Sequence, residues 1–225
     1  MFKIIAQHDD FIVVDKAPGV NFHDEGEQGS GLFSLVKASL NVDNLFPVHR
    51  LDKMTSGLII FAKSLQSAQQ FGQLFEQHHI EKYYLAISDK KPIKKQGLIK
   101  GDMSKSRRGS WKLLRSQKNP AISQFLSFSV APKIRLFLLK PHTGKTHQLR
   151  VALNSLSAPI LGDNQYAGSE SDRGYLHAFA LRFSYQGEEF EFVVKPKYGE
   201  LFTQPEMQDE MTKLLEPWQL NWPKL

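Results

Sequence analysis

Apolar residues recur with two different periods along the chain, and each period predicts a different kind of element. The continuous apolar run LIIFA at 58–62 predicts a strand buried on both faces. Apolar and polar residues alternate over 126–130 and over 188–194, as they do in half-exposed strands, and Gln186-Gly187 predicts a hairpin turn before the second of these. Further strands are expected on both sides of an Asp9-Asp10 turn, over 81–88, over 133–140 and over 180–185.

Other segments show the spacing of helices. Ser64 is a suitable N-cap for a helix that ends near 78–79 and whose apolar residues share one side. Over 146–156 the apolar positions again fall on one side, while His147 and Arg150 share a different face. Arg150 is therefore expected to project away from the packed side of its helix.

The number and order of these elements indicate the fold class. Strands outnumber helices, and only one more short helix is expected, within 203–215. This order favours an α+β fold with a mixed, largely antiparallel sheet. With 225 residues, of which 41% are hydrophobic, the chain can bury one core, so a single domain over 1–225 is expected.

Positive charge is concentrated in one segment. Between Lys90 and Lys118 eleven Lys and Arg residues stand against one acid, Asp102, which gives +10 in a chain of formal charge +6 and leaves −4 for the rest. Such a segment suits a polyanion, and Trp111 within it can stack on a base or ribose, which favours RNA. We expect this basic insert, about 90–118, to form an arm that orders on RNA. A solvated surface loop is the alternative.

The densest group of reactive side chains lies in 47–57, PVHRLDKMTSG. Asp52 stands between Arg50 and Lys53, and nearby cations favour the ionised carboxylate, which is competent as a nucleophile or a base. The small residues 55–57 are expected to hold the loop and to let a ligand approach closely. A salt-bridged turn residue is the alternative interpretation of the aspartate.

Other classes of site have less support. A metal site is an alternative, although the spacing of its candidates matches none of the strong zinc signatures. Those candidates are His49, Asp52, His142 and His147. No G-x-S-x-G elbow indicates a serine hydrolase, and PHTGKTHQLR lacks the spacing of a P-loop. The absence of cysteine excludes disulfides and thiolate sites. No apolar run approaches the roughly 20 residues of a membrane span, and the N-terminus lacks the apolar core of a signal peptide, so a cytoplasmic protein without membrane contact is expected. A monomer is expected because no apolar interface stripe is obvious.

Four segments, in order, resemble the RluA-type pseudouridine synthases. They are VHRLDKMTSGLIIFAKS, KYYLAI, LKPHTGKTHQLRVAL with PILGDNQY, and LHAFALRF, and the resemblance covers about 12–197. It implies two subdomains that flank a central RNA-binding cleft. It also implies isomerisation of uridine to pseudouridine in tRNA or rRNA, without cofactor, metal or obligate protein partner.

The resemblance assigns three residues to the site. Asp52 matches the family's catalytic aspartate, and Arg150 matches the basic residue that pairs with it. Tyr84 matches the tyrosine that stacks on the target base and assists proton removal, although the residues alone favour core packing for the pair Tyr83-Tyr84. Contacts with RNA are expected from His49, Arg50, Lys105, Arg107, Arg108, Lys145 and His147.

The sequence departs from the family pattern in two places. Lys145 stands where many members have arginine. Lysine keeps the positive charge but cannot bind a phosphate through two parallel N–H groups as arginine does. The loop PGVNFHDEGE is more acidic than the family pattern.

The chain begins almost directly with the catalytic domain, so no separate N-terminal RNA-binding module is expected. A catalytically silent RNA-binding protein of the same fold is the alternative function.

Overall fold

The computed structural model describes residues 1–225, and ten of the twelve strands form a single sheet. The sheet has the order β1-β2-β4-β11-β5-β10-β9-β6, with β3 and β12 pairing to β4 and β11. The strands of this sheet are Phe2–Gln7 (β1), Phe11–Lys16 (β2), Phe46–Pro47 (β3), Ser56–Ala62 (β4), Glu81–Ser88 (β5), Gln96–Gly101 (β6), Ala121–Ala131 (β9), Ile134–Pro141 (β10), Leu176–Tyr185 (β11) and Glu188–Val193 (β12). Every pair is antiparallel except β4 with β11, which confirms the expected mixed, largely antiparallel α+β fold.

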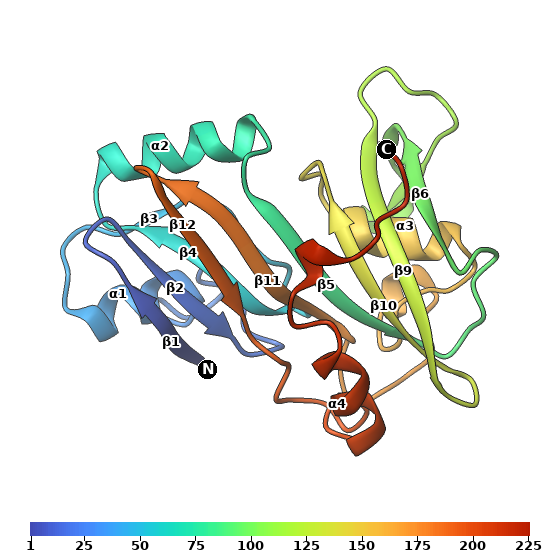
Figure 1. The fold of residues 1–225 in the computed structure, drawn as a ribbon. Helices are drawn as coiled ribbons and strands as arrows, with labels where there is room; N and C mark the ends of the chain where they lie inside the picture. The colour runs from blue at the N-terminus through green and yellow to red at the C-terminus, as the bar shows by residue number, and fades with distance from the viewer.

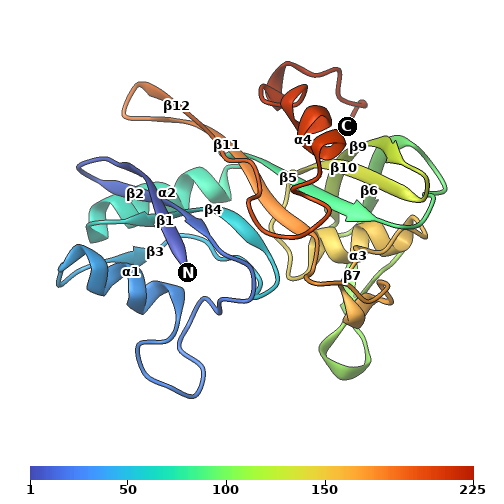
Figure 2. The same cartoon turned by 90° about the horizontal axis from the view of Figure 1, so that it is seen from below.

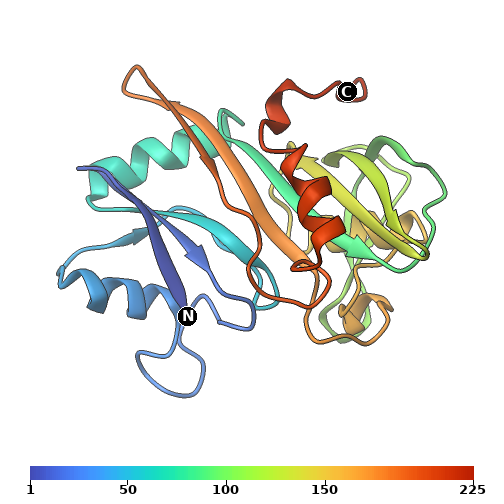
Figure 3. The same ribbon diagram turned by 60° about the horizontal axis from the view of Figure 1, so that its bottom comes forward.

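Two halves of the molecule share this sheet (Figure 1). In the first half β1, β2 and β4 lie with α1 (Leu32–Leu40) and α2 (Leu65–Glu76), and in the second β5, β10, β9 and β6 lie with α3 (Gln148–Ser155). The central strand β11 joins the halves. The helix α4 (Pro205–Thr212) covers the second half on the face opposite α3 (Figures 2 and 3). None of the helices is long and apolar enough to span a membrane.

Burial follows the alternation of side chains along the strands of the first half. One face carries Phe11, Val13, Leu58 and Ile60, which pack against Phe71 of α2. The other face carries Ile12, Val14, Ile59 and Phe61, which pack against Leu32 and Val36 of α1. Because helices cover both faces, every residue of β4 is buried, as the apolar run 58–62 predicts.

The start of α2 also follows the sequence. Ser64 Oγ accepts the Ser67 N–H at 3.0 Å, and Ser67 Oγ accepts the Ser64 N–H at 3.1 Å, so the two serines form a capping box. The helix ends at Glu76, close to the expected end. The chain then enters β5, the strand that carries Tyr84.

The parallel pair β4–β11 lies at the centre of the sheet. Gly57 of β4 pairs with Ala178 of β11, and Ala178 pairs with Tyr84 of β5. Gly57 has φ 108°, and a Cβ placed on it would lie 2.2 Å from the Ala178 carbonyl oxygen, so only glycine fits. The expectation that 55–57 make room for a ligand is therefore wrong for Gly57. Its lack of a side chain brings the three strands together.

The basic insert 90–118 is not one arm. Its first part forms the edge strand β6, while Met103–Lys105 (β7) and Trp111–Leu113 (β8) form a separate two-stranded hairpin around the turn Arg107–Gly109. In Figure 2 this hairpin, drawn in green beside the label β7, projects from the second half next to α3. The projecting arm is thus the β7–β8 hairpin alone. Its ordering on RNA stays a prediction.

Candidate active site

A cleft of about 670 Å³ opens between the two halves of the molecule. Residues 48–52 and Thr55, ahead of β4, form one wall, and the segment from the end of β10 into α3, up to Arg150, forms the other. Tyr84 of β5 and Leu176 of β11 line it as well. The cleft therefore lies where the central parallel pair begins.

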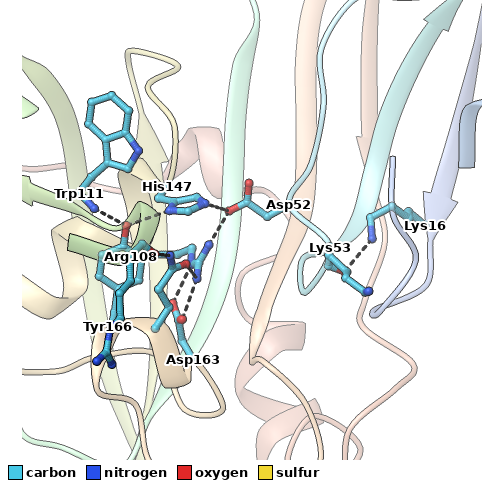
Figure 4. Close-up of polar contacts among 10 residues, drawn as sticks. Lys16, Asp52, Lys53, Arg108, Trp111, His147, Asp163 and Tyr166 are labelled. Atoms are coloured by element: carbon cyan, nitrogen blue, oxygen red, sulfur yellow. Dashed lines mark hydrogen bonds and ion pairs between the residues drawn. The ribbon is translucent and has the colours of Figure 1, made fainter. Parts of the chain in front are cut away.

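Asp52 lies in the first of these walls, with its side chain 23% exposed. The Thr55 N–H donates to the Asp52 carbonyl oxygen at 3.0 Å and closes a turn. The carbonyl oxygen of Lys53 accepts the Gly19 N–H at 2.9 Å and the Lys16 Nζ at 3.1 Å (Figure 4). Lys16 is fully buried, and burial lowers its pKa to about 7. These bonds attach the loop to the end of β2 and leave the Asp52 carboxylate facing the cleft.

Arg150 of α3 is the cation that pairs with Asp52. Its Nη1 lies 3.2 Å from Asp52 Oδ2, across the cleft and 98 residues away in sequence. Arg50 and Lys53, the neighbours of Asp52 in sequence, form no ion pair with it. The carboxylate therefore takes its charge partner from the other half of the molecule.

A second carboxylate holds the same guanidinium group. Arg150 Nε and Nη2 donate to the two carboxylate oxygens of Asp163 at 2.7 and 2.8 Å, and Nη2 also donates to Gln165 Oε1 at 2.8 Å. Arg150 does project away from the apolar stripe of α3, which packs in the core. The segment 163–166 nevertheless folds back over the face that carries Arg150 and leaves this residue only 7% exposed. Bidentate pairing fixes the plane of the guanidinium.

The two adjacent tyrosines of β5 have opposite environments, as the alternation of a strand requires. Tyr83 is fully buried in the core, near Trp218 and Trp222, and its hydroxyl donates to Glu81. Tyr84 faces the cleft. Burial and the charge of Asp52 raise the pKa of Tyr84, so its phenol stays protonated at neutral pH.

His147, at the N-terminus of α3, is the second polar group opposite Asp52. Its Nε2 lies 3.9 Å from Asp52 Oδ2, and its Nδ1 lies 2.8 Å from the hydroxyl oxygen of Tyr166. Burial and the Arg150 guanidinium lower the pKa of His147, which favours the neutral imidazole at pH 7. His147 has φ 57°, a left-handed backbone that is uncommon for a residue with a side chain.

The residues expected to contact RNA fall into two groups. His49, Arg50, Lys145 and His147 line the cleft, whereas Lys105, Arg107 and Arg108 lie on the β7–β8 hairpin outside it. The Nε2 of His49 accepts the Ile60 N–H at 2.9 Å, and burial lowers the pKa of His49 to about 3, so this ring is neutral and supports β4. Contact of these seven residues with RNA stays a prediction.

Residues 163–166 belong to the site although the sequence patterns give them no role. Asp163 and Gln165 hold Arg150, and the Arg150 guanidinium carbon lies 4.8 Å from the centre of the Tyr166 ring. The string PILGDNQY that contains them does belong to the motifs of the resemblance. Their contact with α3 depends on a turn that no periodic pattern predicts.

The arrangement supplies a partly exposed carboxylate, a fixed guanidinium, an aromatic plate with a hydroxyl group and a neutral imidazole around one cleft. No group of three or more His, Asp or Glu side chains is placed to hold a metal ion. A carboxylate next to a fixed cation stays available as a nucleophile or base, and the aromatic plate can stack against a planar base.

Three similar proteins carry related names. An uncharacterized RNA pseudouridine synthase of Haemophilus influenzae is 49% identical over 205 residues, covering 90% of this chain and 91% of the relative. A ribosomal large subunit pseudouridine synthase C of Rickettsia bellii is 32% identical, covering 78% of this chain and 61% of the relative. A tRNA pseudouridine synthase C of Vibrio parahaemolyticus is 27% identical, covering 94% and 98%.

A solved structure and a family model agree with these relatives. Human RNA pseudouridylate synthase domain containing 4 superimposes with a TM-score of 0.73 at 26% identity, covering 91% of this chain and 92% of the human chain. The model of the family described as RNA pseudouridylate synthase matches residues 10–155, well over half of the chain. The RluA-type resemblance is thereby confirmed: the chain belongs to the RNA pseudouridylate synthase family, enzymes that isomerise uridine to pseudouridine.

Proposed function

We propose that this enzyme converts specific uridines of structured RNA to pseudouridine with Asp52 as its catalytic carboxylate. The observation that carries the proposal is the Asp52–Arg150 contact of 3.2 Å across a cleft that Tyr84 also lines. A carboxylate that is 23% exposed can reach a substrate in the cleft, while the buried guanidinium keeps it oriented.

The reaction explains why these groups lie together. The bond between N1 and C1′ breaks, the uracil turns, and C5 bonds to C1′, after which C5 loses a proton and N1 carries one. Asp52 faces the sugar and provides the nucleophile or base. Tyr84 stacks on the uracil and holds it while it is detached. Because the Tyr84 hydroxyl is protonated at neutral pH, it can act as a hydrogen-bond donor. It can accept the proton from C5 only if it gives up its own proton at the same time.

The RNA must present the uridine outside its stack, since Asp52 lies inside a cleft. Flipping a nucleotide costs a few kcal/mol, which contacts with the backbone offset. Arg50 and Lys145 at the cleft, and Lys105, Arg107 and Arg108 on the β7–β8 hairpin, are the cations proposed to meet phosphates.

The names of two relatives suggest the kind of RNA, one the ribosomal large subunit and the other tRNA. We propose a structured RNA of one of these two classes as the substrate. A cytoplasmic monomer is proposed with it, in keeping with the six exposed large apolar side chains, which come from six separate segments rather than from one face of an element.

Release of tritium from RNA labelled at uridine C5 tests the proposal, with Asp52→Asn as the decisive variant. Its rate is expected to fall by at least about 10³-fold while its RNA dissociation constant stays near that of the wild type. Asp209→Asn, which changes an exposed carboxylate on α4, is the matched control and is expected to act normally.

Three outcomes would count against the proposal. A near-normal rate for Asp52→Asn would remove Asp52 from the chemistry. Binding of RNA without tritium release from either rRNA or tRNA would favour the silent RNA-binding alternative. Release that EDTA abolishes would restore the metal-dependent alternative.

A further inference from the structure

Tyr166 lies between the β7–β8 hairpin and the Asp52 carboxylate, and its hydroxyl group has two partners. The hydroxyl oxygen accepts the backbone N–H of Trp111, the first residue of β8, at 2.9 Å. The same oxygen lies 2.8 Å from Nδ1 of His147. Figure 4 shows the row of side chains that results, from Trp111 through Tyr166 and His147 to Asp52.

The partners decide where the protons lie. A tyrosine hydroxyl carries one proton, and the Trp111 N–H can only donate, so the hydroxyl proton is left for another acceptor. His147 Nδ1 is the one acceptor that bonds this hydroxyl. Burial raises the pKa of Tyr166, which keeps the hydroxyl protonated. A neutral His147 that accepts at Nδ1 carries its proton at Nε2, the nitrogen that lies 3.9 Å from Asp52 Oδ2.

The surroundings of His147 agree with a neutral ring held in one orientation. Arg150 from α3 and Arg50 from the opposite wall oppose a positive charge on His147, while Asp52 and Asp163 favour it, and burial outweighs them. Its left-handed backbone at φ 57° is a conformation that neighbouring contacts must maintain.

The ring of Tyr166 has a second contact in the site. The guanidinium carbon of Arg150 lies 4.8 Å from the centre of this ring. One side chain thus touches both groups that face Asp52. Its neighbour Gln165 connects the same elements, since Nε2 donates to the Arg108 carbonyl oxygen at 3.3 Å while Oε1 accepts from Arg150.

From this geometry we propose that Tyr166 is a positioning residue that fixes His147 with its Nε2 proton facing Asp52 and anchors this arrangement to the backbone of the β7–β8 hairpin. His147 then supplies a hydrogen-bond donor to the carboxylate whenever substrate brings the two closer than 3.9 Å. The proposal rests on the proposed role of Asp52 in the synthase reaction.

Tyr166→Phe isolates the hydroxyl group, because the ring under Arg150 is kept. With saturating RNA, kcat is expected to fall on the order of tenfold, while the RNA dissociation constant and the midpoint of thermal unfolding stay near those of the wild type. In a double-mutant cycle with His147→Ala, loss of the hydroxyl is expected to have little further effect. Tyr185→Phe is the matched control, since its hydroxyl also donates to one side chain, Gln70 Oε1, but lines no part of the cleft.

The tautomer of His147 is measured separately, without RNA. The ¹⁵N imidazole signals of wild-type protein, assigned by comparison with His147→Gln among the eight histidines, are expected to show the Nε2–H form. In Tyr166→Phe they are expected to move toward a mixture of both tautomers.

A wild-type spectrum with the proton on Nδ1 would overturn the proposal, even if Tyr166→Phe did not fold. A normal kcat for Tyr166→Phe, or additive effects in the cycle, would overturn it as well. If wild-type protein releases no tritium from any RNA, the proposed function fails, and the spectrum alone decides the position of the proton.

Discussion

Removing one partner of the buried pair between Arg150 and Asp163 should cost more stability than removing one partner of any surface ion pair of the molecule. The two side chains are 8% and 2% exposed, and their contact at 2.7 Å is part of a bidentate arrangement. Removing one partner of a buried pair leaves an uncompensated charge and costs about 3–5 kcal/mol. Asp163→Asn removes the charge at nearly constant volume and turns an amide N–H₂ toward a group that only donates.

The expected loss lies at the lower end of this range, because Asp52 at 3.2 Å still offsets part of the charge on Arg150. A loss of about 3 kcal/mol corresponds to a fall in Tm of roughly 6–12 °C for a chain of this size. Urea unfolding, followed by the fluorescence of Trp218 and Trp222 beside Tyr83, measures it directly.

Glu191→Gln provides the matched control. Its pair with Arg182 has a similar distance, 3.1 Å, but the side chains are 39% and 42% exposed, so the loss should stay within about 1 kcal/mol. If Asp163→Asn lost no more stability than Glu191→Gln, burial would not make the Arg150–Asp163 pair more costly to break than a surface ion pair.

Three further changes have defined expectations. Tyr84→Phe keeps the aromatic plate and should slow turnover at unchanged RNA affinity; a weaker affinity instead would show that the hydroxyl group serves binding. The double variant Arg107→Gln, Arg108→Gln should lower the slope of log Kd against log salt by about 0.7 for each phosphate that these arginines neutralise. The control Lys133→Gln, in the β9–β10 turn, should leave the slope unchanged. Equal slopes for both variants would favour the alternative that the hairpin is a solvated loop without RNA contacts. His177, 1% exposed, has its pKa lowered to about 3 by burial. Because the unfolded chain binds the proton first, stability should fall as pH drops below about 6.5, and this group alone should account for up to about 2 kcal/mol at pH 5. His49 has a similarly lowered pKa and adds to the dependence, so His177→Gln should reduce the pH dependence of urea unfolding by the share of one histidine.

The fold could be predicted where local patterns agree with burial. The apolar run 58–62 becomes a strand covered on both faces, and Ser64 caps α2 as its position before an amphipathic segment indicates. The pairing of β4 with β11 could not be predicted in this way, because the partners are more than 100 residues apart and parallel pairing leaves no turn signal. The fit of Gly57 against Ala178 depends on that pairing.

In the site, too, local sequence motifs could be used for prediction, whereas contacts between distant segments could not. Asp52, Tyr84 and Arg150 were identified by motif strings, and the structure brings them to one cleft. The interpretation of the charges next to Asp52 was wrong, since sequence neighbours such as Arg50 form no ion pair with it while the partner comes from the other half of the molecule. The role of Asp163 could not be predicted from the sequence, because a buried ion pair has no local sequence pattern.

The central place of β11 has a consequence for synthesis of the chain. Asp52 precedes β4 and Arg150 follows β10, and the strand that pairs with both β4 and β5 is Leu176–Tyr185. Until that strand leaves the ribosome, no backbone ladder holds the first half of the sheet against the second. A nascent chain can therefore expose its basic hairpin before the sheet that holds its carboxylate and arginine on opposite walls of one cleft is complete.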